Sequence, residues 1–296
     1  MLLVLCSVLT VLCVLLAVAF YTLFERKILG YSQIRKGPKS VGVLGIFQPF
    51  SDAIKLFMNE KISPMISNNF LFWLAPVLGF CMSLFMWILY PSNFALKYLN
   101  FSLMVFFCVS ALNVYSILIA GWSSNSKYAF LGSVRASAQT ISYEVSLLLV
   151  LLLPVLITLK VNFEEAMMSF PVIMMFFSSM LVWFSSSLAE TNRAPFDFAE
   201  GESELVSGFN IEYGGGLFAL LFLAEYANII FMSMITMVWF LFSKNFLILC
   251  LGTVFFSLIF LLCRAAYPRH RYDLLMMLCW KSFLPYSICM LFLCCL

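Results

Sequence analysis

Eight long apolar stretches divide this chain of 296 residues, and they restrict its fold more than any other feature. A helix needs about 20 mostly apolar residues to cross a bilayer. The mean hydropathy of +1.03 and the 10% share of charged residues agree with several such helices. We therefore expect an all-α, polytopic membrane protein with about eight transmembrane helices. The expected spans are residues 1–24, 71–90, 101–122, 136–159, 171–189, 217–242, 246–263 and 282–296.

No feature divides the chain into separate units. It has no linker, low-complexity tract or convincing internal repeat, so we expect a single integral-membrane domain, residues 1–296. The first 24 residues are longer than a signal-peptide core and lack both a basic leading segment and a small-residue cleavage site. They are expected to remain as the first span. The last span is short, so it either tilts little or begins earlier, near Leu274.

The distribution of lysine and arginine predicts the orientation, because positive residues are retained on the side from which a membrane protein is inserted. Loops that follow odd-numbered spans hold fourteen of them, and the opposite loops hold three, Lys97, Lys160 and Lys244. With an even number of spans, both termini should therefore face away from the cytoplasmic or matrix-like side. The fourteen are Arg26, Lys27, Arg35, Lys36, Lys39, Lys55, Lys61, Lys127, Arg135, Arg193, Arg264, Arg269, Arg271 and Lys281.

The first loop contains a segment with helical periodicity, PFSDAIKLFMNEK. Its apolar residues recur at the spacing of one helix face, and its polar residues take the other face. This pattern predicts an amphipathic helix that lies along the membrane interface and anchors the loop. The apolar set is Phe50, Ala53, Ile54, Phe57 and Met58.

The cysteines and short motifs exclude several classes of function. The ten cysteines lie almost wholly in apolar runs, form no CxxC pair and have no ligand-like spacing to the single histidine, His270. We interpret them as small buried apolar residues in an intracellular or organellar membrane, with no disulfide and no metal site. The chain has no GxGxxG, P-loop, HExxH or GxSxG motif, so nucleotide binding, zinc proteolysis and serine hydrolysis have no support.

Acidic residues gather in one segment, residues 189–216, between the fifth and sixth spans. If residues 197–206 form a helix, Asp197, Glu200 and Glu204 share a face. Close carboxyl groups raise one another's pKa, so such a set can hold and pass protons near neutral pH. The alternative is a solvated acidic loop, although interleaved aromatic and apolar residues favour a packed segment. The six acids are Glu190, Asp197, Glu200, Glu202, Glu204 and Glu212.

Two further acids lie within expected spans, Glu144 in the fourth and Glu225 in the sixth. An ionisable group inside a span is costly and normally faces the interior of the helix bundle, which makes it a candidate functional residue. Glu144 is nearer to the start of its expected helix, where it could reach the membrane surface. Together with Glu190, these residues predict a file of carboxylates that leads from the acidic loop into the bilayer. Basic residues near the loop are explained individually by topology and ion pairing.

Six segments closely resemble subunit 1 of mitochondrial NADH:ubiquinone oxidoreductase, respiratory complex I. The resemblance runs nearly from end to end, with the segments in the family's order and spacing. The segments are ERKILGYSQIRKGP (25–38), QPFSDAIKLF (48–57), AQTISYEV (138–145), AETNRAPFDFAEGESELVSGFNIEY (189–213), FLAEYANII (222–230) and AAYPRHRYDLLMMLCWKSFLP (265–285).

The resemblance implies a membrane-arm subunit that binds no redox cofactor of its own and takes ubiquinone as substrate. NAD, FMN and the iron–sulfur clusters would belong to partner subunits. The implied partners are the iron–sulfur peripheral arm, small membrane-arm subunits, antiporter-like subunits and the lipid bilayer, with no nucleic acid. The implied location is the mitochondrial inner membrane, with both termini on the intermembrane-space side and the loops after odd-numbered spans in the matrix.

The resemblance also implies two sets of site residues. In the mechanism expected here, Glu200 and Glu204 sense quinone reduction and Glu225 relays it into the membrane. The implied proton-coupling path is Glu144, Glu190, Asp197, Glu200, Glu202, Glu204, Glu212 and Glu225. The implied ubiquinone chamber is Glu25, Arg26, Arg35, Arg193, Phe222 and Arg264.

Three alternatives stay open on the sequence alone. Intramembrane carboxylates also mark the ion paths of secondary transporters, although neither inverted repeats nor paired broken helices are apparent. The equivalent subunit of a membrane-bound hydrogenase-type complex would share these motifs without quinone. A purely structural anchor would leave Glu144 and Glu225 unexplained.

Overall fold

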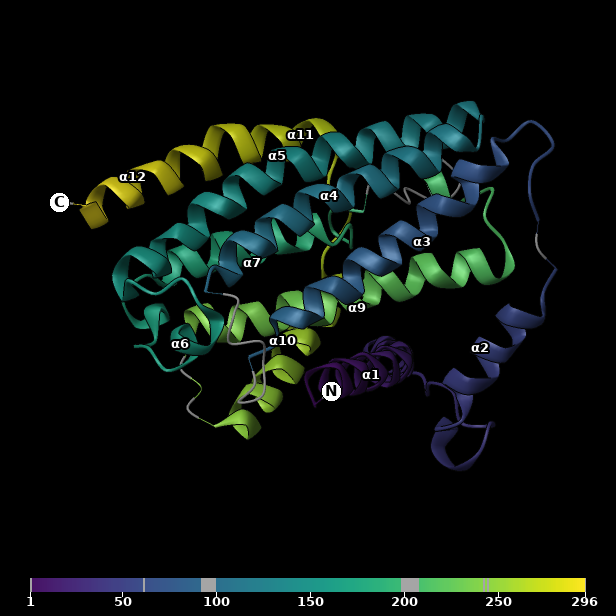
Figure 1. Ribbon diagram of the computed structural model, residues 1–296, viewed down its shortest axis with the longest axis horizontal. Helices are drawn as coiled ribbons and strands as arrows, with labels where there is room; N and C mark the ends of the chain where they lie inside the picture. The colour runs from purple at the N-terminus through teal and green to yellow at the C-terminus, as the bar shows by residue number, and fades with distance from the viewer. Residues whose placement is uncertain are drawn as a thin grey trace.

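The computed structural model describes residues 2–60, 62–91, 100–197, 208–241, 243 and 245–295, with side chains described from residue 6 onward. These residues form helices joined by turns and longer loops, and no strand occurs among them (Figure 1). The long apolar runs give rise to this architecture because a helix satisfies its own backbone hydrogen bonds, which lipid cannot do. The all-α fold expected from the sequence is confirmed.

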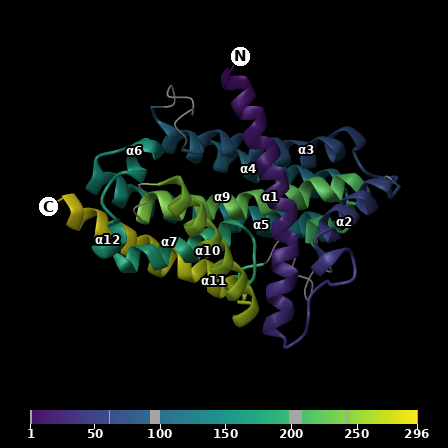
Figure 2. The same cartoon turned by 90° about the horizontal axis from the view of Figure 1, so that it is seen from below.

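Four long helices form the centre of the molecule (Figure 1). They are α3 (Asn69–Met86), α4 (Ser102–Ser123), α5 (Lys127–Thr158) and α9 (Gly215–Phe240). Two helices pack on α9, namely α1 (Leu2–Ser32) and α10 (Phe246–Ala266). Figure 2 shows α1 running across the direction of α9. The outer side of α5 is covered by α7 (Phe177–Glu190), α11 (Tyr272–Leu278) and α12 (Leu284–Cys295).

The core surrounds the second half of α9, where every residue from Phe231 to Phe240 is buried. Large side chains fill the space around it, with the Trp87 and Phe231 rings 5.6 Å apart and the Trp183 and Phe240 rings 5.9 Å apart. Since α9 is the most enclosed of the described candidate spans, polar residues along its first half project toward other helices rather than toward lipid. This arrangement determines the surroundings of Glu225.

Among the described residues, seven helices are long and apolar enough to cross a membrane. The expected span 171–189 differs: it consists of a 3₁₀ turn, Val172–Met174, followed by the 14-residue helix α7. At 1.5 Å per residue, α7 is about 21 Å long, shorter than a hydrocarbon core of about 30 Å. The run is continuous in hydropathy, but Pro171 lacks a backbone N–H and Phe176 has a non-helical backbone, so the helix starts later.

Three other spans are longer than their apolar cores. Helix α1 continues to Ser32, α5 begins at Lys127, and α11 and α12 join through a π-helical turn, Cys279–Phe283, into one span from Tyr272 to Cys295. The last span therefore begins earlier than residue 282, near the earlier of the two starting points considered. Glu144 consequently lies near the middle of α5 rather than near its start.

The amphipathic helix of the first loop is confirmed as α2 (Gln48–Met58). Its apolar face is exposed in this chain, with Ile54 64% and Phe57 62% accessible, which suits contact with the membrane interface. A salt bridge of 2.7 Å between Arg26 Nη1 and Asp52 Oδ2 holds α2 to α1. The edge-to-face contact of Phe20 and Phe50, with ring centroids 6.0 Å apart, strengthens the same junction.

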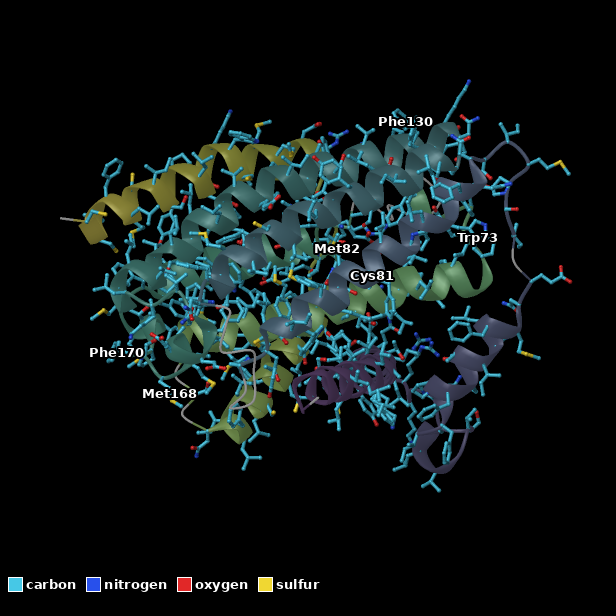
Figure 3. The ribbon with its side chains drawn as sticks, in the orientation of Figure 1. Trp73, Cys81, Met82, Phe130, Met168 and Phe170 are labelled. Atoms are coloured by element: carbon cyan, nitrogen blue, oxygen red, sulfur yellow. The ribbon has the colours of Figure 1, made fainter. Side chains whose placement is uncertain are left out.

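The outer surface carries many apolar side chains, as expected for lipid contact. Figure 3 shows Trp73, Phe130, Met168 and Phe170 on the outside of the bundle. All ten cysteines are free. The expectation that they are buried is wrong for most of them, because only Cys279 is buried and six are exposed on the apolar surface.

Candidate functional site

A cluster of charged side chains forms around Glu25, which is 4% exposed near the end of α1. Arg264, in the last turn of α10, forms an ion pair with Glu25 Oε1. The hydroxyl of Tyr226 on α9 donates a hydrogen bond of 2.5 Å to Glu25 Oε2. Arg193, just beyond the end of α7, approaches Oε1 with its Nη1 at 3.6 Å. Helices α1, α9 and α10 are thus joined to the α7 end by one buried carboxylate.

Arg193 connects this cluster to a second acid. Its Nη2 lies 3.8 Å from Glu225 Oε2, and its guanidinium carbon lies 4.5 Å from the centre of the Tyr226 ring. The side chain is only 10% exposed, and that of Glu225 is 21% exposed. An arginine can serve two carboxylates because its planar guanidinium presents five N–H donors. Arg193 therefore holds Glu25 and Glu225 on either side of a single positive charge.

Glu225 also lines a cavity of about 60 Å³ together with Glu144 of α5 and Glu190 of α7. The Ser110 hydroxyl lies 3.5 Å from Glu144 Oε1, and Glu190 Oε2 is buried without a hydrogen-bond partner among the described residues. A cavity of this size has room for a few water molecules, since one requires about 10–15 Å³. The other polar residues of its lining are Ser110, Asn113, Ser116, Thr140, Thr191, Asn192 and Asn228.

A smaller cavity of about 30 Å³ adjoins the first and shares part of its wall. The shared residues include Asn113, Glu190 and Asn228, while Met86 and Phe106 close the far side. The polar interior therefore ends against the apolar core. Glu144, Glu190 and Glu225 are brought together as the sequence predicted for intramembrane acids.

Asp197 lies outside this cavity and takes part in a different contact. Its Oδ2 accepts a hydrogen bond of 3.2 Å from Arg269 Nη2, and the backbone N–H of His270 donates to Pro195 O at 3.1 Å. The rings of Phe196 and His270 stack with centroids 5.5 Å apart. These contacts connect the start of the acidic loop to the segment between α10 and α11.

The remaining predicted residues are dispersed. Glu200, Glu202 and Glu204 lie outside the described residues, as does most of the segment 197–206. Glu212 is half-buried before α9 and is not part of the cavity lining. Arg26 is exposed and paired with Asp52, and Arg35 is exposed. Phe222 is half-buried between the rings of Phe218 and Tyr226, at 4.4 Å and 6.5 Å.

Sequence reasoning missed the amides of Asn113 and Asn228 and the hydroxyl of Tyr226. A signal for two of them exists, because Asn228 follows Glu225 by three residues and Asn113 follows Ser110 by three. Residues three apart share a helix face, so a polar pair at this spacing inside an apolar span indicates a polar interior face.

The fold and the site define a class: a helical, polytopic membrane protein that buries acidic and basic side chains among its helices. The chain belongs to the NADH dehydrogenase family, which matches residues 5–295. The resemblance seen in the sequence is thereby confirmed.

Proteins with one shared name, from distantly related animals, are similar to this chain over most of its length. The chain is 51% identical to NADH-ubiquinone oxidoreductase chain 1 of Aedes aegypti over 290 residues, which are 97% of this chain and 93% of the relative. It is 52% identical to the same chain of Artemia franciscana over 97% of this chain and 95% of the relative. It is 49% identical to the same chain of Balaenoptera physalus over 93% of this chain and 90% of the relative. The family match over residues 5–295 includes every residue of the charged cluster and of the cavity lining.

Proposed function

We propose that this chain is a mitochondrial membrane subunit of an NADH–ubiquinone oxidoreductase, complex I, and that its buried charges couple quinone reduction to proton translocation. The names of its relatives support the first part of this proposal. The chain supplies no complete active site by itself. NAD, FMN and iron–sulfur clusters would be held by other subunits, from which electrons reach ubiquinone next to this chain.

The cluster around Glu25 is the proposed wall of the ubiquinone chamber, formed by Glu25, Arg26, Arg35, Arg193, Phe222 and Arg264. Phe222 and Tyr226 place aromatic rings beside the charged groups, which suits a quinone that has a polar head and an apolar tail. An apolar groove of about 360 Å³ between α1, α9 and α10 starts beside this cluster, and Phe24 and Tyr21 are part of its lining. Its size and lining suit an isoprenoid tail.

The observation that carries the coupling proposal is the position of Arg193 between Glu25 and Glu225. Reduction of a quinone to a quinol takes up two electrons, which the partner subunits would supply, and two protons. Protons withdrawn from groups of the chamber wall would change the charge beside Glu25. Two unit charges 4 Å apart interact by about 4 kcal/mol at an effective dielectric constant of 20, several times the thermal energy. A change in the charge beside Glu25 therefore alters the electrostatic energy of the Glu225 carboxylate, because both carboxylates lie next to Arg193.

From Glu225 the proposed path continues through the cavity to Glu144 and Glu190. A carboxyl group in a low-dielectric cavity favours its neutral form, and neighbouring carboxyl groups titrate as a coupled set. A change in the protonation of one carboxyl group thus changes the protonation of the others. Asp197, Glu200, Glu202, Glu204 and Glu212 extend the path on the proposed matrix side, with both termini on the intermembrane-space side.

The test replaces Glu225 by glutamine in the assembled complex in sealed vesicles. Glu225→Gln keeps the shape and removes the titratable group, so we expect a lower ratio of protons pumped to quinone reduced. Glu165→Gln is the matched control, because Glu165 lies beyond the other end of α5 and pairs with Lys160 at 2.8 Å. A Glu225→Gln complex that pumps with the wild-type ratio would refute the coupling role.

A further inference from the structure

We propose that Gln139 is a positioning residue that fixes Glu190, Arg193 and Asp197 relative to α5. The inference rests on the proposed function, because it concerns how the carboxylate path is held. The hydrogen bonds of Gln139 go to the backbone that carries these residues and not to their side chains.

The geometry is a two-point attachment. Gln139 is fully buried on α5, and its Nε2 donates hydrogen bonds to Ala189 O at 2.8 Å and to Phe196 O at 2.9 Å. Ala189 O belongs to the peptide group that joins Ala189 to Glu190. Phe196 O belongs to the peptide group that joins Phe196 to Asp197. One side chain therefore binds the two peptide groups from which two predicted site residues extend.

The segment between these two attachment points is short and carries Arg193. Within it, the N–H of Arg193 donates to Leu188 O at 3.4 Å and the N–H of Phe196 donates to Arg193 O at 2.9 Å. The segment thus forms a compact turn whose two ends meet at Gln139. The position of Arg193, and with it the bridge from Glu25 to Glu225, depends on this turn.

Gln139 differs from the hydroxyl residues of the same helix. The side chains of Ser133, Ser137, Thr140 and Ser146 donate to carbonyl groups of α5 itself. Gln139 instead reaches residues 50 and 57 positions away. Only an amide or another multiple donor can serve two carbonyl groups at once, because a hydroxyl has a single hydrogen. The residue type is thus required by the double attachment.

The consequence is mechanical. Glu144 lies on α5 five residues after Gln139, so the attachment makes α5 and the 189–197 segment move together. Glu144 and Glu190 then keep their shared cavity when either element shifts. Without the attachment, both buried carbonyl groups lose the amide of Gln139 as a donor, although Ala189 O keeps the backbone N–H of Asn192 at 3.3 Å. The segment is then free to take other arrangements.

The experiment compares three variants of the intact complex in sealed vesicles at about pH 6 and about pH 8, on either side of neutrality. Gln139→Leu keeps the volume and removes both donors. Gln139→Glu is isosteric, and only its protonated form has one O–H donor. Ser146→Ala is the control, since Ser146 is fully buried on α5 and bonds within the helix. Both the quinone reductase rate and the ratio of protons pumped to quinone reduced are measured.

We expect Gln139→Leu to lower the pumping ratio roughly twofold or more at both pH values, because the loss of even a weak hydrogen bond shifts an equilibrium by about this factor. Gln139→Glu, whose protonated form restores one of the two hydrogen bonds, should give a ratio between those of Gln139→Leu and the wild type at the lower pH, and should fall to the Gln139→Leu ratio at the higher pH. Ser146→Ala should keep the wild-type ratio. If residue 139 merely filled space, the pumping ratio of Gln139→Glu would not depend on pH. Equal pumping ratios of Gln139→Leu and Gln139→Glu at both pH values would therefore overturn the inference.

The two proposals fail in different ways. If Glu225→Gln uncouples while Gln139→Leu pumps with the wild-type ratio, the positioning role is refuted and the path survives. If Glu225→Gln pumps normally, the path itself is refuted. If the Gln139→Leu complex does not assemble, the pH dependence of Gln139→Glu decides, and a flat profile would refute the positioning role.

Discussion

The hydroxyl of Tyr226 on α9 lies 2.5 Å from Oε2 of Glu25 on α1, so a single hydrogen bond connects helices whose residues are 201 positions apart. The acceptor is a buried carboxylate that also forms ion pairs with Arg264 and Arg193. Hydrogen bonds to ionised groups contribute more than neutral ones, about 1.5–3 kcal/mol. The bond therefore contributes to holding α1 against α9.

Tyr226→Phe should reduce stability by about 1.5–3 kcal/mol, because it removes the donor and keeps the ring. The measurement is the temperature at which the purified complex loses quinone reductase activity. Tyr286→Phe is the matched control, since the Tyr286 hydroxyl forms an exposed hydrogen bond of 2.5 Å with the neutral Ser178. Equal losses in the two variants would contradict the special role of the buried acceptor.

Arg193→Gln should be more damaging than any other single change in the charged cluster. It leaves Glu25 and Glu225 without their shared cation, and removing one partner of a buried ion pair costs about 3–5 kcal/mol. Assembled complex should fall sharply on native gels. Arg193→Lys should rescue only in part, because one ammonium group cannot serve both carboxylates as a guanidinium does.

The double variant Arg193→Gln/Glu225→Gln gives the matching control. Removing the negative charge of Glu225, which loses the nearby guanidinium in Arg193→Gln, should restore part of the assembled complex relative to Arg193→Gln alone. Strictly additive effects of the two changes would show that Arg193 and Glu225 do not interact, contrary to their 3.8 Å separation.

Much of this fold could be predicted from the sequence, because hydropathy and helical periodicity report directly on burial in lipid. The helix α2 follows from its apolar spacing. Hydropathy does not predict the ends of a helix where the backbone determines them, as at Pro171, or where the helix continues into charged residues. The expected first span, residues 1–24, stops before Glu25 for this reason, yet Glu25 lies inside α1, which ends at Ser32.

The site was predictable only in part. That Glu144 and Glu225 face one interior follows from the cost of a charge in lipid. That Arg193 bridges Glu225 to Glu25 does not follow, because Glu25 precedes Arg193 by 168 positions and the pairing depends on how α1 crosses α9. The attachment of Gln139 to two distant carbonyl groups was equally hidden, since backbone acceptors leave no trace in a sequence.

Asp197 and Arg269 should show a measurable but modest coupling. Their side chains are 3.2 Å apart and 9% and 39% exposed, so solvent screens the pair on the arginine side. A double-mutant cycle with Asp197→Asn and Arg269→Gln, read out by thermal inactivation, should give about 1 kcal/mol and decrease with added salt. Arg271→Gln, an exposed change in the same segment, should give no coupling to Asp197.

Gly121 should not tolerate a side chain, because α4 and α5 approach each other closely at this position. A methyl group there would collide with the Ser133 side chain and lie 2.8 Å from the backbone oxygen of Ala129. Backbone cannot move aside cheaply, so Gly121→Ala should cost about 1–3 kcal/mol through overpacking. Gly252→Ala is the matched control, since the added methyl would meet only the flexible side chain of Met237. We expect a lower inactivation temperature and less assembled complex for Gly121→Ala, with Gly252→Ala close to wild type; the reverse order would show that α4 and α5 are not packed as described.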